Sequence, residues 1–202
     1  MFKDLGADGI IEGGQTMNPS TQDILLQINR TPAEIVFVFP NNKNIIMAAE
    51  QCIPLSEKKV VVIPTKNVPQ GVSAMLALDT YAEEDECVAT LTETAERVHV
   101  ASVTYAARDS EFDGHSIKAG EYLALLDGAL LGSFTELPVL MEVVCDRLKS
   151  YDPELISVYY GEDVSEDGAA AVSETISAQI PDAEVSVVSG GQPVYYFWIA
   201  AE

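Results

Sequence analysis

The sequence EIVFVFPNNKNIIMAAEQC, residues 34–52, contains in order a continuous apolar run, a polar turn and an amphipathic pattern. The run over residues 34–39 is typical of a strand that is buried on both faces. Asn41 or Asn42 is expected to cap the helix that follows. The residues expected to face inward from that helix are Ile45, Ile46, Ala49 and Cys52. A strand, a loop and a helix in this order predict the first part of a parallel βαβ unit.

The same pattern extends to both sides of this stretch. On the C-terminal side, Lys59–Pro64 (KVVVIP) predicts a second buried strand, and Pro69-Gln70-Gly71 opens another helix. On the N-terminal side, the small and amide residues of Gly13–Thr21 predict a tight loop that leads into a helix from Gln22 to Arg30. Ile10-Ile11 is a candidate short strand. The first half is therefore expected to be α/β with a parallel, Rossmann-like sheet.

The second half has a different character. Gly128 separates two apolar runs in a hairpin-like arrangement, and Leu137–Leu148 predicts an amphipathic helix. Strands are expected at His99–Ala107, Tyr122–Asp127, Leu130–Phe134, Leu155–Tyr160, Val185–Val188 and Val194–Ala200, with a further helix at Val172–Ile180 and turns at Asp109–Gly114. We predict two subdomains, 1–98 and 99–202, the second built on a mixed or antiparallel sheet with helices.

Three loops in the first subdomain each follow a strand candidate and precede a helix. The carboxyl ends of parallel strands share one edge of a sheet, so these loops are expected to converge there and to form a small-ligand site. Amides, hydroxyls and two ammonium groups suit a carboxylate or a phosphate. The alternative is that these residues only cap helices and satisfy the hydrogen-bonding groups of the loop backbone. The candidate ligand-binding residues are Gln15, Thr16, Asn18, Ser20, Asn41, Asn42, Lys43, Asn44, Thr65, Lys66, Asn67 and Gln70.

Residues Glu83–Val98 predict an amphipathic helix with the most sharply acidic face in the chain. Its candidate partner-binding residues are Glu83, Glu86, Glu93 and Glu96. The chain has 32 acidic and 11 basic residues, a formal net charge of -21. Such a charge disfavours nucleic acid and anionic lipid and favours a basic protein partner. An acidic helix face that is only solvated explains the same pattern.

The three cysteines, Cys52, Cys87 and Cys145, are widely spaced and form no Cys-x-x-Cys pair. They are expected to be buried free thiols in a reducing cytosol, which places the protein in the cytoplasm. Residues 1–14 do not have the pattern of a secretory signal, and no apolar run reaches the ~20 residues that span a bilayer. We therefore expect no integral membrane segment. A chain that begins directly at Phe2–Gly6 fits an excised domain.

Several chemical motifs are weak or missing. Asp163, Ser165, Asp167 and Glu174 have the spacing of a calcium loop, but a strand candidate precedes them where a helix is needed. Helix capping explains these residues as well. The two histidines have no neighbouring pattern of a metal ligand or a general base. No phosphate-binding lysine loop or nucleophile elbow is found, so we expect no catalytic residues, no metal site and no cofactor in this chain.

Five segments, in order, resemble one family: GGQTMNPSTQDIL, FPNNKNIIMAAEQ, VVIPTKNVPQGVSAMLA, DGHSIKAGEYLALLDG and GGQPVYYFWIAAE. They are similar to the C-terminal domain of bacterial fatty-acid kinases, the DhaL-type, dihydroxyacetone-kinase-like proteins. The resemblance implies a DegV-like fold for the first subdomain and a role in fatty-acid phosphorylation. It also implies that ATP and magnesium are bound by an N-terminal domain, which is missing here.

The resemblance implies two partners, a DegV-like fatty-acid-binding protein and the rest of the kinase chain. The expected function is non-catalytic: the domain docks the acyl-carrying protein so that its bound carboxylate meets the kinase centre and the acyl phosphate forms. Two alternatives stay open. One is a regulatory domain that binds an acyl or phosphate ligand in the strand-edge loops. The other is kinase or phosphatase activity in its own right.

Overall fold

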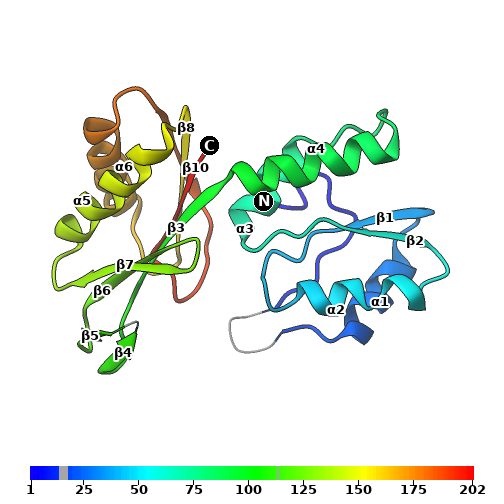
Figure 1. Ribbon diagram of the computed structural model, residues 1–202, viewed down its shortest axis with the longest axis horizontal. Coiled ribbons are helices and arrows are strands. Elements are labelled where there is room, and N and C mark those ends of the chain that lie inside the picture. Colours follow the sequence, from blue (N-terminus) through cyan, green and yellow to red (C-terminus); the bar gives the residue numbers. More distant parts are fainter. Residues whose placement is uncertain (14–17, 113) are drawn as a thin grey trace. The chain divides into compact units, whose positions relative to one another are not determined.

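A computed structural model describes residues 1–13, 18–112 and 114–202 of the chain (Figure 1). The chain divides into two compact units, Met1–Val98 and His99–Glu202. Each unit has its own sheet and its own helices.

Unit 1 is built around two parallel strands, β1 (Ile35–Val38) and β2 (Lys59–Val62). A short helix α2 (Ile46–Glu50) and a 3-10 turn η1 (Ile53–Leu55) connect them, which completes a βαβ unit. The parallel direction follows from this crossover, since a helix must return the chain to the starting edge of the sheet. Within the described part of unit 1 the sheet has two strands, so a wider Rossmann-like sheet is not formed there.

Helices cover both faces of this pair. Helix α1 (Thr21–Arg30) and α2 pack against Val36 and Val60, whereas α3 (Val68–Leu76) and α4 (Glu84–Arg97) lie on the other side. On that other side, Phe37 and Val61 join a second cluster with Leu91 of α4. Alternate residues of a strand point to opposite faces, so the unbroken apolar runs of β1 and β2 match burial from both sides.

Unit 2 contains a six-stranded sheet. Every neighbouring pair is antiparallel except the last, which is parallel, so the sheet is mixed. Its strand order is β7 (Ala129–Phe134), β6 (Tyr122–Leu126), β3 (His99–Tyr105), β10 (Phe197–Ala201), β8 (Leu155–Tyr160) and β9 (Glu184–Ser189). A small separate hairpin is formed by β4 (Ser110–Phe112) and β5 (His115–Ile117).

Two helices, α5 (Leu137–Leu148) and α6 (Glu166–Gln179), pack side by side on one face of this sheet (Figure 1). They bury Leu140, Val144 and Ile176 against Phe197 and Ile199 of the central strand β10. A 3-10 turn η2 (Lys149–Tyr151) follows α5. This is the main core of unit 2.

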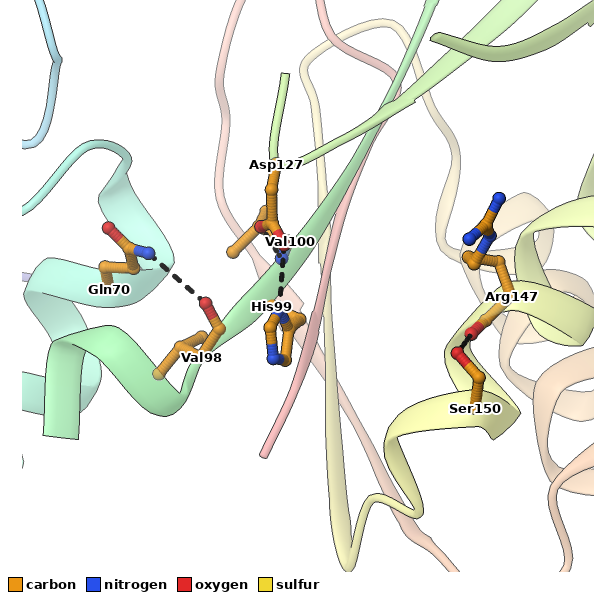
Figure 2. Close-up of polar contacts among 7 residues, drawn as sticks. All are labelled: Gln70, Val98, His99, Val100, Asp127, Arg147 and Ser150. Carbon is orange, nitrogen blue, oxygen red and sulfur yellow. Dashed lines mark hydrogen bonds and ion pairs between the residues drawn. The ribbon is translucent and has the colours of Figure 1, made fainter. Parts of the chain in front are cut away.

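The start of β3 is fixed by the turn between β6 and β7. Asp127 and Gly128 have φ of 51° and 91°, the left-handed pair that a tight hairpin requires. The Asp127 carboxylate accepts a hydrogen bond from Val100 N over 3.0 Å and contacts His99 Nδ1 at 2.7 Å (Figure 2). Tyr151 stacks on the His99 ring with centroids 3.7 Å apart. His99 is therefore held on two sides, in keeping with a structural role.

The structure corrects three local expectations. Ile10-Ile11 is not a strand; Ile10 is exposed, and no strand in the described part of the chain pairs with it. Neither Asn41 nor Asn42 caps α2, whose N-cap is Ile45 without a side-chain bond. The turn-rich segment after β3 contains the β4–β5 hairpin in place of turns alone.

Candidate functional site

Two of the three predicted loops meet at the carboxyl edge of β1 and β2. The Thr65 hydroxyl donates to Asn41 Oδ1 over 2.8 Å, and the Asn41 backbone N–H donates back to Thr65 Oγ1 over 3.0 Å. Thr65 is fully buried, and Asn41 adopts a left-handed φ of 55° that amide residues tolerate. This pair joins the loop after β1 to the loop after β2.

A second set of bonds organises the start of α3. Asn67 is its N-cap and accepts from Gln70 N over 3.0 Å, while Pro69 lies in the first turn. The Gln70 side chain is buried: its Oε1 accepts from Lys66 N over 2.8 Å, and its Nε2 donates to Val98 O over 3.2 Å (Figure 2). Gln70 thus ties the start of α3 to the residue that follows α4.

These bonds occupy much of the polar capacity predicted for a ligand. The oxygens of Asn41, Asn67 and Gln70 all accept hydrogen bonds within the protein. A Cβ at Gly71 would lie 1.9 Å from Asn41 Oδ1, so the loop after β1 packs directly on α3. In these two loops, three predicted site residues remain exposed: Lys43, Asn44 and Lys66. Asn42 is half-buried, and its side-chain oxygen accepts from Asn44 N over 2.9 Å.

The third predicted loop is described only in part. Gln15 and Thr16 lie outside the described residues. Asn18 and Ser20 are exposed, and Ser20 forms a reciprocal capping box with Asp23 at the start of α1. The Ser20 hydrogen bonds hold the pKa of the Asp23 carboxyl below its usual range. Ser20 therefore serves α1 locally.

The acidic residues predicted on one helix lie on α4 or at its N-cap. Its inward stripe is Cys87, Leu91 and Ala95, all buried. The candidates on the outer side, Glu83, Glu86, Glu93 and Glu96, are all exposed.

Ion pairs within the chain engage one of these four carboxylates and one neighbouring carboxylate of α4. Glu93 pairs with Arg97 one turn later, and Glu84 pairs with Lys59 of β2 at 2.6 Å. Glu86 and Glu96 form no ion pair with any residue that the structure describes. Asp85 is exposed in the first turn of α4 and was not among the predicted residues. Its place among the acidic residues that open the helix could have identified it.

Two broader features concern metals and membranes. The described residues contain no group of three or more His, Cys, Asp or Glu side chains placed to hold a metal ion. Ser165, part of the calcium-like spacing, is the N-cap of α6 and accepts from Gly168 N over 3.2 Å. Across the described part of the chain, every helix is too short or too polar to traverse a lipid bilayer.

Curated relatives match the chain from end to end. Protein YloV of Bacillus subtilis (strain 168) is 37% identical over 202 residues, which is 100% of this chain and 36% of that protein. A protein of Staphylococcus aureus (strain USA300) is also 37% identical over the whole chain, which covers 37% of its length. The chain thus spans little more than a third of these relatives.

Solved structures share the fold at low sequence identity. The Streptococcus pneumoniae fatty acid kinase B3 protein, loaded with linoleic acid, has a TM-score of 0.65 and 15% identity over 91% of this chain and 76% of its own. A DegV family protein from Corynebacterium glutamicum has a TM-score of 0.65 and 12% identity, over 91% of this chain and 83% of its own. The dihydroxyacetone kinase of C. freundii, in complex with AMP-PNP and Mg2+, has a TM-score of 0.60 and 12% identity, over 91% of this chain and 41% of its own.

The family of the chain is shown by a match that covers its whole length. Residues 1–202 match the family of FakA-like C-terminal domains of the fatty acid kinases. The resemblance found in the sequence motifs is therefore correct, and the chain belongs to this FakA-like C-terminal family.

Proposed function

We propose that this chain is the docking domain of a fatty acid kinase, and that it binds a DegV-like fatty-acid-binding protein for acyl phosphate formation. Family membership supports the kinase context. The observation that carries the docking role is the outer face of α4, where Glu83, Glu86, Glu93 and Glu96 are all exposed. A cluster of one sign attracts a complementary basic surface and orients its approach.

The strength of this attraction depends on several carboxylates acting together. One exposed ion pair contributes only ~0.2–1 kcal/mol. Glu86 and Glu96 are available to a partner without breaking an ion pair that the structure describes, whereas Glu93 must share its charge with Arg97. We therefore expect Glu86 and Glu96 to contribute more than Glu93.

The proposal assigns the phosphoryl transfer to the remainder of the kinase. ATP and Mg2+ would be bound there, because a phosphoryl-transfer centre needs a phosphate-binding loop and metal-holding carboxylates. The chain spans 36% of YloV, which leaves room for such a domain in relatives of that length. On this proposal, the chain brings the substrate carrier to the kinase centre and does no chemistry itself.

The test is binding to the DegV-like fatty-acid-binding protein of the same organism, measured by calorimetry. The double reversal Glu86→Lys/Glu93→Lys should weaken binding, and both residues are exposed. The matched control Glu142→Lys/Glu174→Lys changes the net charge equally, at exposed positions on α5 and α6. Equal losses in the two variants would reduce the effect to net charge, and no binding by the wild type would overturn the docking role.

A second candidate is a binding site for an acyl or phosphate ligand at the strand-edge loops. It is favoured by the fold, since solved structures of this fold are described as loaded with linoleic acid and as binding stearic acid. The exposed Lys43 and Lys66 would supply positive charge to a carboxylate. A fatty acid that raises the melting temperature of the wild type, but not of Lys43→Ala/Lys66→Ala, would support this role.

A further inference from the structure

Aromatic side chains form a continuous row across one end of the unit 2 sheet. Phe134 of β7 lies opposite Tyr122 of β6, which lies opposite Tyr105 of β3. Tyr196, just before β10, completes the row: its ring centroid is 5.7 Å from that of Tyr105 and 5.6 Å from that of Tyr122. We call Phe134, Tyr122, Tyr105 and Tyr196 the aromatic row.

The row is only partly covered. Tyr105 is 44% exposed, and the other three side chains are half-buried. The β4–β5 hairpin lies along the chain between Tyr105 and Tyr122, at the same end of the sheet as these residues (Figure 1). Partly exposed tyrosines beside one another are typical of the centre of a protein interface, because they offer large contact area at little entropic cost.

A strained turn fixes the last member of the row. Val194 has φ of 73°, and the Tyr195 N–H donates to Pro193 O over 2.8 Å, which together indicate a γ-turn centred on Val194. This conformation is strained for a β-branched residue and persists only where surrounding contacts hold it. Here the Thr104 hydroxyl donates to Val194 O over 2.7 Å, next to Tyr105.

Further contacts make the turn rigid. Gly161 N donates to Tyr196 O over 2.9 Å, and a Cβ at Gly161 would lie 2.2 Å from Tyr195 O. Gln192 is buried and its Nε2 donates to Tyr159 O over 3.0 Å. The Tyr196 ring is therefore held against Tyr105 and Tyr122 before any partner arrives, which lowers the entropic cost of binding.

One carboxylate, that of Asp163, lies near the row. Burial, the neighbouring Tyr122 and Tyr105, and the Asp163 carboxylate raise the pKa of Tyr196, so Asp163 is within electrostatic reach of its hydroxyl. Two basic residues lie between Tyr105 and Tyr122 in sequence: Lys118 pairs with Asp109 at 3.3 Å, and Arg108 is exposed. Aromatic faces are themselves negative, so the row and Asp163 together attract a cation.

We propose that the aromatic row is a docking site for an arginine-bearing segment of the protein partner. A guanidinium is planar and weakly hydrated, so it stacks on tyrosine rings while pairing with a carboxylate, whereas an ammonium is a compact and strongly hydrated charge. The net charge of -21 favours a basic segment over an acidic or neutral one. This inference rests on the proposed docking function and adds a site on unit 2 to the acidic face of α4.

Substitutions at Tyr105, the most exposed member of the row, test the site. Tyr105→Ala should weaken binding of the DegV-like fatty-acid-binding protein roughly tenfold, and Tyr105→Phe should retain most of it because the ring is kept. Tyr81→Ala removes a tyrosine that is 98% exposed in unit 1 and should have no effect. Unchanged melting temperatures would exclude unfolding. A wild type that binds, with a Tyr105→Ala variant that binds equally well, would overturn the site but leave the docking function standing.

A second experiment, with short peptides, tests the aromatic row independently of the protein partner. Hexa-arginine should bind the wild-type chain more tightly than hexa-lysine, and Tyr105→Ala should remove that preference. If the wild type does not bind the DegV-like protein, the docking function fails, while this preference still supports an arginine-binding row. Equal affinity for the two peptides would leave only net-charge attraction and overturn the assignment of a guanidinium.

Discussion

Thr65 and Asn41 exchange hydrogen bonds across the carboxyl edge of the unit 1 sheet. The Thr65 hydroxyl donates to Asn41 Oδ1 over 2.8 Å and accepts from the Asn41 backbone N–H over 3.0 Å. One buried hydroxyl therefore satisfies two polar groups of a loop 24 residues away in sequence. Because Gly71 packs on the same Asn41 side chain, the pair also fixes how the loop after β1 meets α3.

Removing the Thr65 hydroxyl should destabilise unit 1. Thr65→Val keeps the shape of the side chain but leaves both Asn41 groups without this partner, at a cost of ~1–3 kcal/mol. The free energy of unfolding from urea titration measures it. Thr65→Ser, which keeps the hydroxyl, should lose much less. A larger loss in Thr65→Ser than in Thr65→Val would assign the effect to the methyl group instead of the hydrogen bonds.

Relieving the turn at Val194 should stabilise unit 2. Glycine adopts a φ near 73° without steric cost, and the Val194 side chain is 49% exposed, so Val194→Gly loses little packing. A net gain of ~1 kcal/mol would raise the melting temperature by about 2–4 °C. A lower melting temperature would show that valine packing outweighs the strain, and Val187→Gly, at a 43% exposed strand position, should be destabilising by comparison.

The free energy of unfolding should fall at alkaline pH because Cys145 is buried. Burial raises the pKa of its thiol from 9.0 to about 11. Folding then favours the protonated thiol, so its contribution is complete below pH ~9 and is lost as the pH rises toward ~11, by about 2–3 kcal/mol. Unfolding free energies of wild type and Cys145→Ala at pH 8 and pH 10.5 check this. The variant should show a shallower decline, and parallel declines would contradict the assignment.

Much of the element pattern in unit 1 could be predicted because burial dominates it. The strands β1 and β2 are covered on both faces, and the unbroken apolar runs in their sequences indicate this burial. The cap of α2 could not be predicted, because Asn42 makes a local bond to Asn44 N instead and α2 is only five residues long. Asparagine favours such local turns as strongly as caps, so sequence alone does not separate them.

In unit 2 the sequence pattern identifies strands better than it identifies their ends. The pattern predicts a strand from Val194, but β10 begins at Phe197 because Val194 lies in a turn held by Thr104, 90 residues away in sequence. The β4–β5 hairpin resembles turns alone in the sequence, since its strands have three residues each and are mostly exposed. The contact that delays the start of β10 is distant in sequence, and the strands of the hairpin are too short to give a periodic signal.

The site shows the same division. Convergence of the loops after β1 and β2 follows from parallel topology, and the Asn41–Thr65 bonds confirm it for those two loops. Which groups the amide oxygens accept from, a hydroxyl for Asn41 and backbone N–H groups for Asn67 and Gln70, depends on side-chain geometry that no spacing rule contains. The aromatic row could not be predicted from the sequence for a related reason, since Tyr122 and Phe134 become neighbours only through the register of β6 and β7.

The chain alone should not turn over ATP. Phosphoryl transfer needs metal-bound phosphates and a positioned nucleophile, and the proposal places these in the rest of the kinase. Purified chain should therefore release no phosphate above background with Mg2+ and ATP, in the presence or absence of a fatty acid. Turnover that co-purifies with the chain and disappears in a point variant of it would contradict this.

Binding to the DegV-like partner should weaken as salt increases. Raising the ionic strength from 0.1 M to 1 M shortens the screening length from ~10 Å to ~3 Å, so the exposed carboxylates of α4 lose their reach. Neutralising Glu86 and Glu96 should make the dependence of log affinity on log salt shallower, because both are exposed and unpaired among the described residues. Neutralising Glu142 and Glu174 should change it less. If the Glu86/Glu96 variant kept the full wild-type slope, α4 would not be the docking face, and the aromatic row would remain as the surface to test.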